Sequence, residues 1–545
     1  MYYDRKNILD TLIRRVNSFS DGYRQNIALL GEPSIGKTTV IKNLLASDSL
    51  KKDFLLPIYI EIKIEPFEFY AKRFIKSALT QLIKSDSLLA APQETVLLIG
   101  DLAQNYPKLA QICTRVLQDI EKSKFDEAFS FMMDIPMILS EETKKRCILI
   151  LDEFHNLSNF ALKNPFGILA KKIMIQKDTM YTLVSSKTTL SQRLLSEKLS
   201  LLFGNFEKII LSPFDISISR VFLQNNITGA VFPPSYLDFI ASFTGNRPFY
   251  MQAICDEIER GVFSKKIAQD SHYKLIEHAF IETLFKKRGM INQHFSNLLF
   301  KISEGKLLSR SLSVLFALSS ENKKQHDIIK ASRLQSRDVS RILCTLTEMD
   351  MIARNGALYR FQDKLFHFWI QSVYLKRISS FSIEEELEEN SFKKDLSNKF
   401  NLFMQEFEKE CSSRVIELFR LFKNDVIQLN GKKHKFISFT DVQKIEEASN
   451  DSSNILAVSG RQKWLCTIKK KSITENDIAE IIKNTKDQKR HNKVNRNILV
   501  AFQGINENAY LMAKEAKFWT WDLETLNILM ELYGKPHIIN DEGKL

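Results

Sequence analysis

The feature that most constrains the fold lies near the amino end of the chain. A short apolar run at residues 27–30 leads into a glycine-containing loop and then into a helical pattern, TTVIKNLL. The loop, GEPSIGKT at residues 31–38, satisfies the spacing GxxxxGK[ST]. Between a strand and a helix, such glycines let consecutive backbone N–H groups face phosphate oxygens, and the helix N-terminus favours the same anion. The segment predicts a phosphate-binding loop within an α/β fold. The alternative is an accidental glycine-rich turn.

Each position of this loop has an expected role. Lys37 is predicted to reach the β- and γ-phosphates and to act in catalysis, and the Thr38 hydroxyl is predicted to bind Mg²⁺. The residues predicted to surround the nucleotide are Gly31, Glu32, Pro33, Ser34, Ile35, Gly36, Lys37, Thr38 and Thr39.

A second motif, RCILILDE at residues 146–153, is an apolar strand that ends in two acids. Asp152 is expected to hold Mg²⁺ through water, and Glu153 to orient and deprotonate the attacking water. A base at this position distinguishes hydrolases from P-loop kinases. The alternative is a pair of surface acids that merely end a strand. Ser185 and Ser186 close the next strand, where the hydroxyls of both could sense the γ-phosphate, and Ser186 is the predicted nucleotide contact, although serines are common at strand ends.

Further strands are predicted at residues 55–62, 147–151, 180–184 and 208–211, each separated from the next by helical patterns. This alternation favours a parallel sheet covered on both faces. A long helical insertion is expected at residues 69–143. Gly and Pro are sparse, at 17 and 12 of 545 residues, which also favours a multidomain, helix-rich α/β chain.

The length of 545 residues predicts several domains. We place the sheet domain at residues 1–212, a helical lid at 213–304, a winged helix-turn-helix at 305–375, an acidic linker at 376–395 and a terminal domain at 396–545. The acidic stretch IEEELEEN is expected to form a solvated helix or linker.

The net charge is +13, which admits a polyanionic partner, although a compositional bias toward lysine explains it equally well. Residues 461–500 hold 11 Lys and Arg against 4 Asp and Glu, so about half of the excess lies in one segment. The 6 cysteines show no CxxC spacing, which disfavours a disulfide framework and a thiolate zinc site. Because no signal core or long apolar run occurs, we expect a cytoplasmic protein without a membrane segment.

The segments GEPSIGKTT, RCILILDEFHNL, LFGNFEKIILSPFD and FTGNRPFYMQ together resemble the prokaryotic archaeal-type ATPases, a branch of the AAA+/STAND P-loop proteins. The resemblance covers residues 1–370. It implies ATP as the ligand, Mg²⁺ as the cofactor, and hydrolysis of ATP to ADP and phosphate. In that family an arginine commonly stands where this chain has Asn205, and Arg193 or Arg220 could replace it.

The same resemblance extends to the lid and to the amino end. Gly245 and Pro248 match a glycine-x-x-proline motif that tracks nucleotide state, and Arg247 is an expected γ-phosphate contact. Pro248 could instead simply begin a helix. Tyr3, Asp4 and Arg5 lie where the family lines its adenine pocket.

Residues 308–372 show three helical patterns followed by a hairpin with Asn355 and Gly356 at its turn, the order of a winged helix-turn-helix. Arg337, Ser340 and Arg341 lie on the polar face of the predicted recognition helix and are candidate DNA contacts. Such domains also serve as protein-packing modules, and this alternative stays open.

The tail resembles, in outline, the restriction-endonuclease-like PD-(D/E)xK fold. That chemistry needs an Asp and a Glu to bind Mg²⁺, with a Lys beside them. Here Asn454 and Thr467 occupy the acid positions and Lys469 remains, which predicts a domain that does not cleave. Asp441 or Asp451 could supply an acid if the alignment is shifted. The basic run KNTKDQKRHNKVNR could contact phosphates or could be a solvated helix end.

The leading hypothesis is an ATP-hydrolysing switch with double-stranded DNA as its target. The alternatives are an ATP-gated nuclease and an ATP-dependent scaffold for a protein partner without nucleic acid. The oligomeric state stays open, because ring-forming and monomeric relatives share these motifs.

Overall fold

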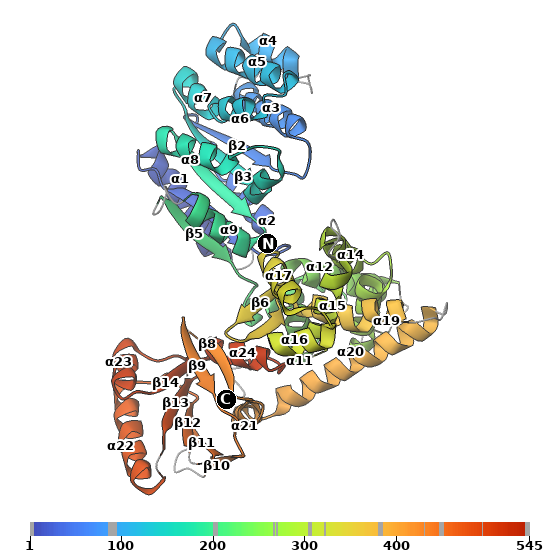
Figure 1. Cartoon of the computed structure of the whole chain (residues 1–545), viewed down its shortest axis with the longest axis vertical. Helices are drawn as coiled ribbons and strands as arrows, with labels where there is room; N and C mark the ends of the chain where they lie inside the picture. Colours follow the sequence, from blue (N-terminus) through green and yellow to red (C-terminus); the bar gives the residue numbers. More distant parts are fainter. Residues whose placement is uncertain are drawn as a thin grey trace. The chain divides into compact units, whose positions relative to one another are not determined.

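The computed structural model describes residues 5–85, 95–199, 205–264, 268, 271–302, 308–320, 323–379, 385–429, 431–445, 452–460, 462–492 and 494–539. The chain divides into two compact units (Figure 1). Unit 1 comprises Met1–Phe214 with the short segments Arg247–Phe249 and Glu348–Asp350. Unit 2 comprises Asp215–Asn246, Tyr250–Thr347 and Met351–Leu545.

Unit 1 is built on a parallel sheet of five strands in the order β2-β3-β4-β1-β5. The strands are β1 (Asn26–Gly31), β2 (Leu55–Glu61), β3 (Arg146–Asp152), β4 (Thr179–Ser185) and β5 (Phe206–Leu211). The parallel sheet predicted from the apolar runs is confirmed. Since β4 lies between β1 and β3, the carboxyl ends of all three strands meet at one edge of the sheet, where open α/β sheets bind their ligands.

Alternate residues of the central strands enter two separate cores, one on each face of the sheet. Ile27 and Leu29 pack into the core beside α1 (Lys6–Ser20) and α2 (Lys37–Ala46), whereas Ala28 and Leu30 pack into the core on the other face. This alternation explains why β1 is apolar throughout, because both faces of a parallel strand are buried.

Between β2 and β3 the chain is helical. The helices are α3 (Phe67–Ser85), α4 (Thr95–Leu102), α5 (Pro107–Glu121), α6 (Phe125–Met132) and α7 (Ile135–Thr143). They share the larger core with α8 (Pro165–Ile175), which lies between β3 and β4 in the chain.

Unit 2 begins with helices and continues with three helices and a hairpin. The helices of the first part are α10 (Ile216–Asn226), α11 (Pro234–Phe243), α12 (Pro248–Phe263), α13 (His272–Phe280) and α14 (Met290–Ile302), of which α12 starts within the unit 1 segment. The second part comprises α15 (Leu308–Ser319), α16 (Gln325–Ser332), α17 (Ser336–Glu348), β6 (Ile352–Asn355), β7 (Leu358–Phe361) and α18 (Lys364–Trp369).

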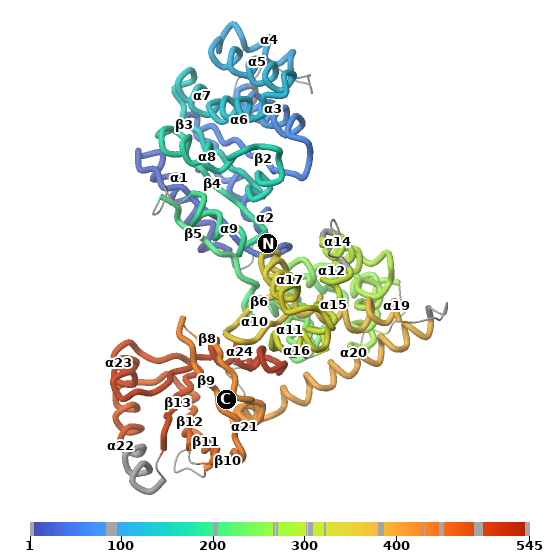
Figure 2. The backbone as a smooth tube through the Cα atoms, viewed as in Figure 1, coloured from blue at the N-terminus to red at the C-terminus, as the bar shows by residue number. Residues whose placement is uncertain are grey.

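The long helix α20 (Glu385–Glu408) runs through the position 395–396, where the sequence suggests a domain boundary (Figure 2). Its amino half holds Glu385, Glu386, Glu388 and Glu389 of the expected linker. Its carboxyl half carries Phe400 and Phe403, whose rings pack edge-on against Phe239 of α11. Apolar side chains within the helix thus tie it to the preceding helices, a contact that charge patterning does not reveal.

The terminal part contains α21 (Cys411–Arg420), a hairpin and a second five-stranded sheet. The hairpin pairs β8 (Asp425–Leu429) with β9 (Lys432–Phe436). The sheet has the order β10-β11-β12-β13-β14, with strands β10 (Asp441–Ile445), β11 (Ser452–Ser459), β12 (Gln462–Lys469), β13 (Arg496–Ala501) and β14 (Trp519–Asp522). Helices α22 (Glu475–Asn492), α23 (Glu507–Glu515) and α24 (Leu523–Leu532) complete it. Among the described helices, none is both long and apolar enough to cross a membrane.

Candidate nucleotide site

The predicted phosphate loop connects β1 to α2 through two residues in the left-handed region. Ser34 has φ 63° and Gly36, which caps α2, has φ 99°. Gly31 is constrained differently, since a Cβ on it would lie 2.9 Å from the carbonyl oxygen of Leu211. The two glycines of the motif are therefore required for different reasons. Gly36 adopts a left-handed backbone conformation, and Gly31 allows two strands to approach closely.

Lys37 is buried at the start of α2, and its ammonium group donates hydrogen bonds to the loop's own carbonyls. Its Nζ lies 2.8 Å from the oxygen of Gly31 and 2.7 Å from that of Glu32. Burial lowers the pKa of Lys37, and the nearby carboxylates of Glu153, Asp152 and Glu32 oppose that shift. The structure thus holds a positive charge inside the loop with its donors directed at oxygen acceptors. The side chains of Thr38 and Thr39 are exposed.

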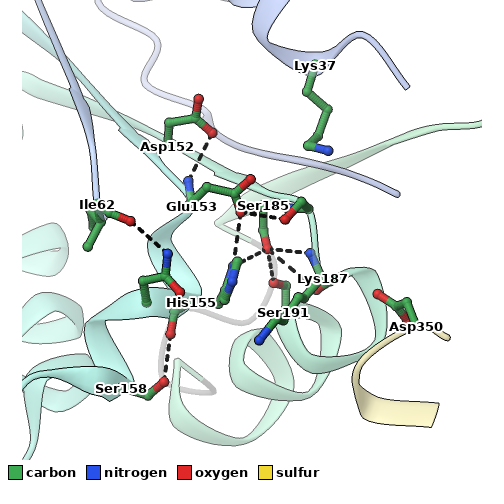
Figure 3. Close-up of polar contacts among 12 residues, drawn as sticks. Lys37, Ile62, Asp152, Glu153, His155, Ser158, Ser185, Lys187, Ser191 and Asp350 are labelled. Atoms are coloured by element: carbon green, nitrogen blue, oxygen red, sulfur yellow. Dashed lines mark hydrogen bonds and ion pairs between the residues drawn. The ribbon is translucent and has the colours of Figure 1, made fainter. Parts of the chain in front are cut away.

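Asp152 ends β3 and is buried at the carboxyl edge of the sheet (Figure 3). One carboxylate oxygen accepts a hydrogen bond from the backbone N–H of Glu153 at 2.9 Å. The other accepts one from the hydroxyl of Tyr59 on β2, also at 2.9 Å. Burial, with the charge of Asp152, raises the pKa of Tyr59, so this hydroxyl keeps its proton and donates. Tyr59 fixes the orientation of Asp152, a role the sequence analysis did not assign.

Glu153 follows with φ 53°, a left-handed conformation that is uncommon for a non-glycine residue. Its carboxylate accepts hydrogen bonds from the backbone N–H of Ser186 at 2.9 Å and from the Ser186 hydroxyl at 2.8 Å. His155 Nδ1 lies 3.3 Å from the same oxygen. Burial raises the pKa of Glu153, against the opposing hydrogen bonds of Ser186. A carboxylate with a raised pKa is better matched to taking a proton from water near neutral pH.

The two serines predicted as phosphate sensors have different surroundings. Ser186 contacts Glu153 directly, as described above. Ser185 is fully buried, and its hydroxyl lies 2.8 Å from His155 Nδ1 and 2.6 Å from the Ser191 hydroxyl. In this arrangement Ser185 positions His155, two residues after the predicted base in the DEFH segment (Figure 3).

Arg247, an expected γ-phosphate contact, is buried and forms an ion pair with Glu32 of the phosphate loop. Both residues belong to unit 1. Pro248, which follows, is the first residue of α12. Arg5 is also buried: its guanidinium donates to the carbonyl of Ser212 at 2.6 Å and lies over the Phe214 ring. Tyr3 and Asp4 lie outside the described residues.

The two arginines that could replace the family's arginine at position 205 both pair with acidic side chains. Arg193 pairs with Glu348. Arg220 makes two parallel hydrogen bonds to Asp238 of α11, at 2.9 and 2.7 Å. Asn205 contributes its backbone carbonyl to the N–H of Asn26 at the start of β1. Within unit 1, Asp350 accepts the N–H of Thr189, at the start of the helix that follows Ser186, at 3.2 Å.

The candidate DNA contacts lie on α17. Arg337 and Arg341 are exposed, and Val339, Ile342 and Leu343 are buried on the other side of the helix. The Ser340 hydroxyl donates to the carbonyl of Ser336 and accepts from the side chain of Gln325, both at 2.8 Å. This hydroxyl therefore connects α17 to α16.

In the terminal sheet, Asn454 of β11 and Thr467 of β12 face each other, and the Thr467 hydroxyl donates to the Asn454 side-chain oxygen at 2.7 Å. Lys469 forms an ion pair of 2.8 Å with Asp477, which lowers the pKa of Asp477 to about 2. Asp441, the alternative acid, pairs in register with Val458, four residues along β11 from Asn454, and its carboxylate accepts a hydrogen bond from Gln443. Asp451 lies outside the described residues. Across the part of the chain that is described, no three His, Cys, Asp or Glu side chains are grouped to hold a metal.

The loop, the buried lysine and the two acids define a P-loop nucleotide-binding domain. Comparison with known proteins gives a narrower class of P-loop domain. Residues 20–177, which contain the phosphate loop and both acids, match the AAA domain family. The nucleotide-binding part is therefore an ATPase domain of the AAA+ type. No curated protein matches the chain in sequence.

Several solved structures are similar in fold. A Walker-type ATPase of Pyrococcus abyssi has a TM-score of 0.46 at 15% identity, covering 68% of this chain and 96% of that one. The Aeropyrum pernix ORC2 protein has a TM-score of 0.42 at 12% identity, covering 69% and 95%. The RuvB Holliday junction branch migration motor of Thermotoga maritima has a TM-score of 0.32 at 13% identity, covering 67% and 94%.

Proposed function

We propose that this protein is an ATP-hydrolysing switch that acts on double-stranded DNA. The observation that carries the ATPase part is the meeting of Lys37, Asp152 and Glu153 at the carboxyl edge of one parallel sheet. These residues supply a phosphate-binding cation, a metal-orienting carboxylate and a water base.

The residues fit a bound Mg²⁺, which would neutralise charge on the β- and γ-phosphates. Thr38 would ligate it directly, and Asp152 would hold it through water. Each oxygen of the Asp152 carboxylate accepts one hydrogen bond in the structure, and a carboxylate oxygen has two lone pairs, so capacity for metal-bound water remains on both.

The work of the chain's own residues in hydrolysis follows from their positions. Lys37 exchanges its hydrogen bonds to the loop carbonyls for bonds to phosphate oxygens. Glu153 orients the attacking water and takes its proton, while Ser186 and His155 limit the carboxylate to a narrow range of orientations. Arg247 is close enough to the loop to sense the added phosphate charge, since it already pairs with Glu32.

The DNA part of the proposal is supported by the helix order α15, α16, α17 and the hairpin β6–β7, which is that of a winged helix-turn-helix. Arg337 and Arg341 present two cations on the exposed side of α17. We further infer that the terminal domain is a nuclease-like fold without cleavage chemistry, because Asn454 and Thr467 pair as neutral groups where that reaction requires carboxylates.

The test is the rate of ATP hydrolysis by the full chain with and without double-stranded DNA. We expect basal hydrolysis that DNA changes several-fold, with plasmid DNA left uncut in Mg²⁺. Hydrolysis that does not respond to DNA, together with no DNA binding at low salt, would contradict the DNA part and leave the ATPase part intact. Cutting of the plasmid that Lys469→Ala abolishes would contradict the inference about the terminal domain.

A further inference from the structure

The turn of the hairpin β6–β7 lies against β8 of the terminal part, within unit 2 (Figure 1). The backbone N–H of Ala357 donates to the carbonyl of Val426 at 2.9 Å, and the Asn355 side-chain oxygen accepts the N–H of Gln428 at 2.7 Å. Gly356, at φ 61°, has no room for a side chain, since a Cβ would lie 2.1 Å from the Val426 oxygen. The turn is therefore held on β8 by backbone geometry that only glycine permits at this position.

Ion pairs also connect the segment that contains β6–β7 with the terminal part of the chain. Asp425 at the start of β8 is buried, lies 2.7 Å from the ammonium of Lys324, and accepts the hydroxyl of Tyr533. Arg360 of β7 forms an ion pair of 2.5 Å with Glu531 of α24. The β6–β7 hairpin and the β8–β9 hairpin therefore pack together, with Gly356 partly buried and Ala357 exposed in the turn that contacts β8.

The β8–β9 hairpin buries Ile427, Leu429 and Phe436 on one face, which also carries Asp425, His434 and Lys432, and exposes two lysines on the other face. Phe436 is buried, and alternate residues of β9 carry Lys433 and Lys435, both exposed. The register places Lys433 opposite Gln428 and Lys435 opposite Val426 on this outer face. The acid of β8, Asp425, is buried and paired with Lys324, so it does not neutralise the two lysines. The outer face of the hairpin is thus positively charged. One of its two strands, β8, also contacts the turn of β6–β7.

We propose that this outer face of β8–β9, through Lys433 and Lys435, binds the phosphate backbone of double-stranded nucleic acid while the turn of β6–β7 stays docked on β8. The inference rests on the proposed DNA function. Two lysines separated by one residue on a strand lie about 7 Å apart, which suits a repeating anion. Lysine recognises phosphate as a point charge and does not read base edges, so this contact is independent of sequence.

The test measures binding of a labelled DNA duplex to the full chain over a range of salt concentrations. Lys433→Gln with Lys435→Gln is expected to reduce the slope of log affinity against log salt by about 1.8, because each phosphate contact contributes about 0.9. The control is Lys171→Gln with Lys177→Gln, two exposed lysines of unit 1 whose loss changes the net charge equally. The control should keep the wild-type slope, and both variants should keep basal ATP hydrolysis.

The possible results separate this inference from the proposed function. If wild-type chain binds the duplex but the β9 variant keeps its slope, the assignment of the hairpin is overturned and the DNA function stands. If wild-type chain does not bind duplex at any salt concentration, both are overturned. As a second measurement, Asn355→Ala is expected to speed hydrogen exchange at the Gln428 amide, which donates to Asn355; unchanged exchange would contradict the docking of the turn.

Discussion

Replacing Glu153 by glutamine changes the chemistry of the nucleotide site without changing its shape. In the structure, one oxygen of Glu153 accepts both hydrogen bonds from Ser186, at 2.9 and 2.8 Å. A glutamine side-chain oxygen can accept the same two bonds, so the local fold and ATP binding should persist. What the variant loses is a group that can take a proton from water.

The loss of this base sets the expected decrease in the rate of ATP hydrolysis. General base catalysis contributes roughly 10²- to 10⁴-fold, which corresponds to about 3–5 kcal/mol of activation free energy. The pH profile gives a second measure. Because burial raises the pKa of Glu153, the wild-type rate should fall on acidification at a pH above the ordinary range of a glutamic acid, as the base becomes protonated. The glutamine variant should lack this limb.

The assay is single-turnover release of phosphate, with ATP affinity measured separately on the same protein. Ser186→Ala serves as the matched control, since it removes one hydrogen bond to Glu153 but leaves the base and the backbone N–H in place. We expect a several-fold loss for this control. A Glu153→Gln variant that hydrolyses ATP within about threefold of the wild-type rate would refute the assignment of the base, because the general-base contribution starts at roughly 100-fold.

Three further predictions concern other parts of the molecule. Lys37→Ala should abolish ATP binding in equilibrium dialysis, and retained micromolar affinity would contradict the role of the loop. Arg247→Ala should weaken ATP binding about tenfold, because it removes the cation that faces the Glu32 carboxylate in the phosphate loop, and adding Glu32→Gln should restore part of the affinity; additive effects would show that the pair is not coupled. Partial burial raises the pKa of Glu531, but the hydrogen bond from His537 and the charges of Lys364 and Arg360 outweigh this effect and lower the pKa to about 2. The ion pair should therefore contribute about 3 kcal/mol of stability above the usual pKa of a glutamate, lost as pH falls through about 2, and Glu531→Gln should remove that contribution in urea unfolding at pH 7.

Much of the nucleotide-binding unit could be predicted from local sequence. The five strands follow from apolar runs, and the phosphate loop from the spacing of Gly31, Gly36 and Lys37, because these features depend on backbone conformation and burial over a few residues. Asp152 and Glu153 are likewise recognised by their place at the end of a buried strand. The sequence also located three helices and a hairpin around α17 from periodicity and the Asn355–Gly356 turn signal, although the two turn residues are Gly356 and Ala357, one position later.

The partners of these residues were decided only by the tertiary structure. Tyr59 reaches Asp152 because β2 and β3 are neighbours in the sheet, and Arg220 is committed to Asp238 because α10 packs on α11. The docking of the hairpin turn on β8 joins residues that are about seventy positions apart in the chain. Spacing along a sequence fixes which backbone conformations and faces a segment can present. Which groups then share a buried site, and which pKa values shift, depends on long-range packing that no local pattern encodes.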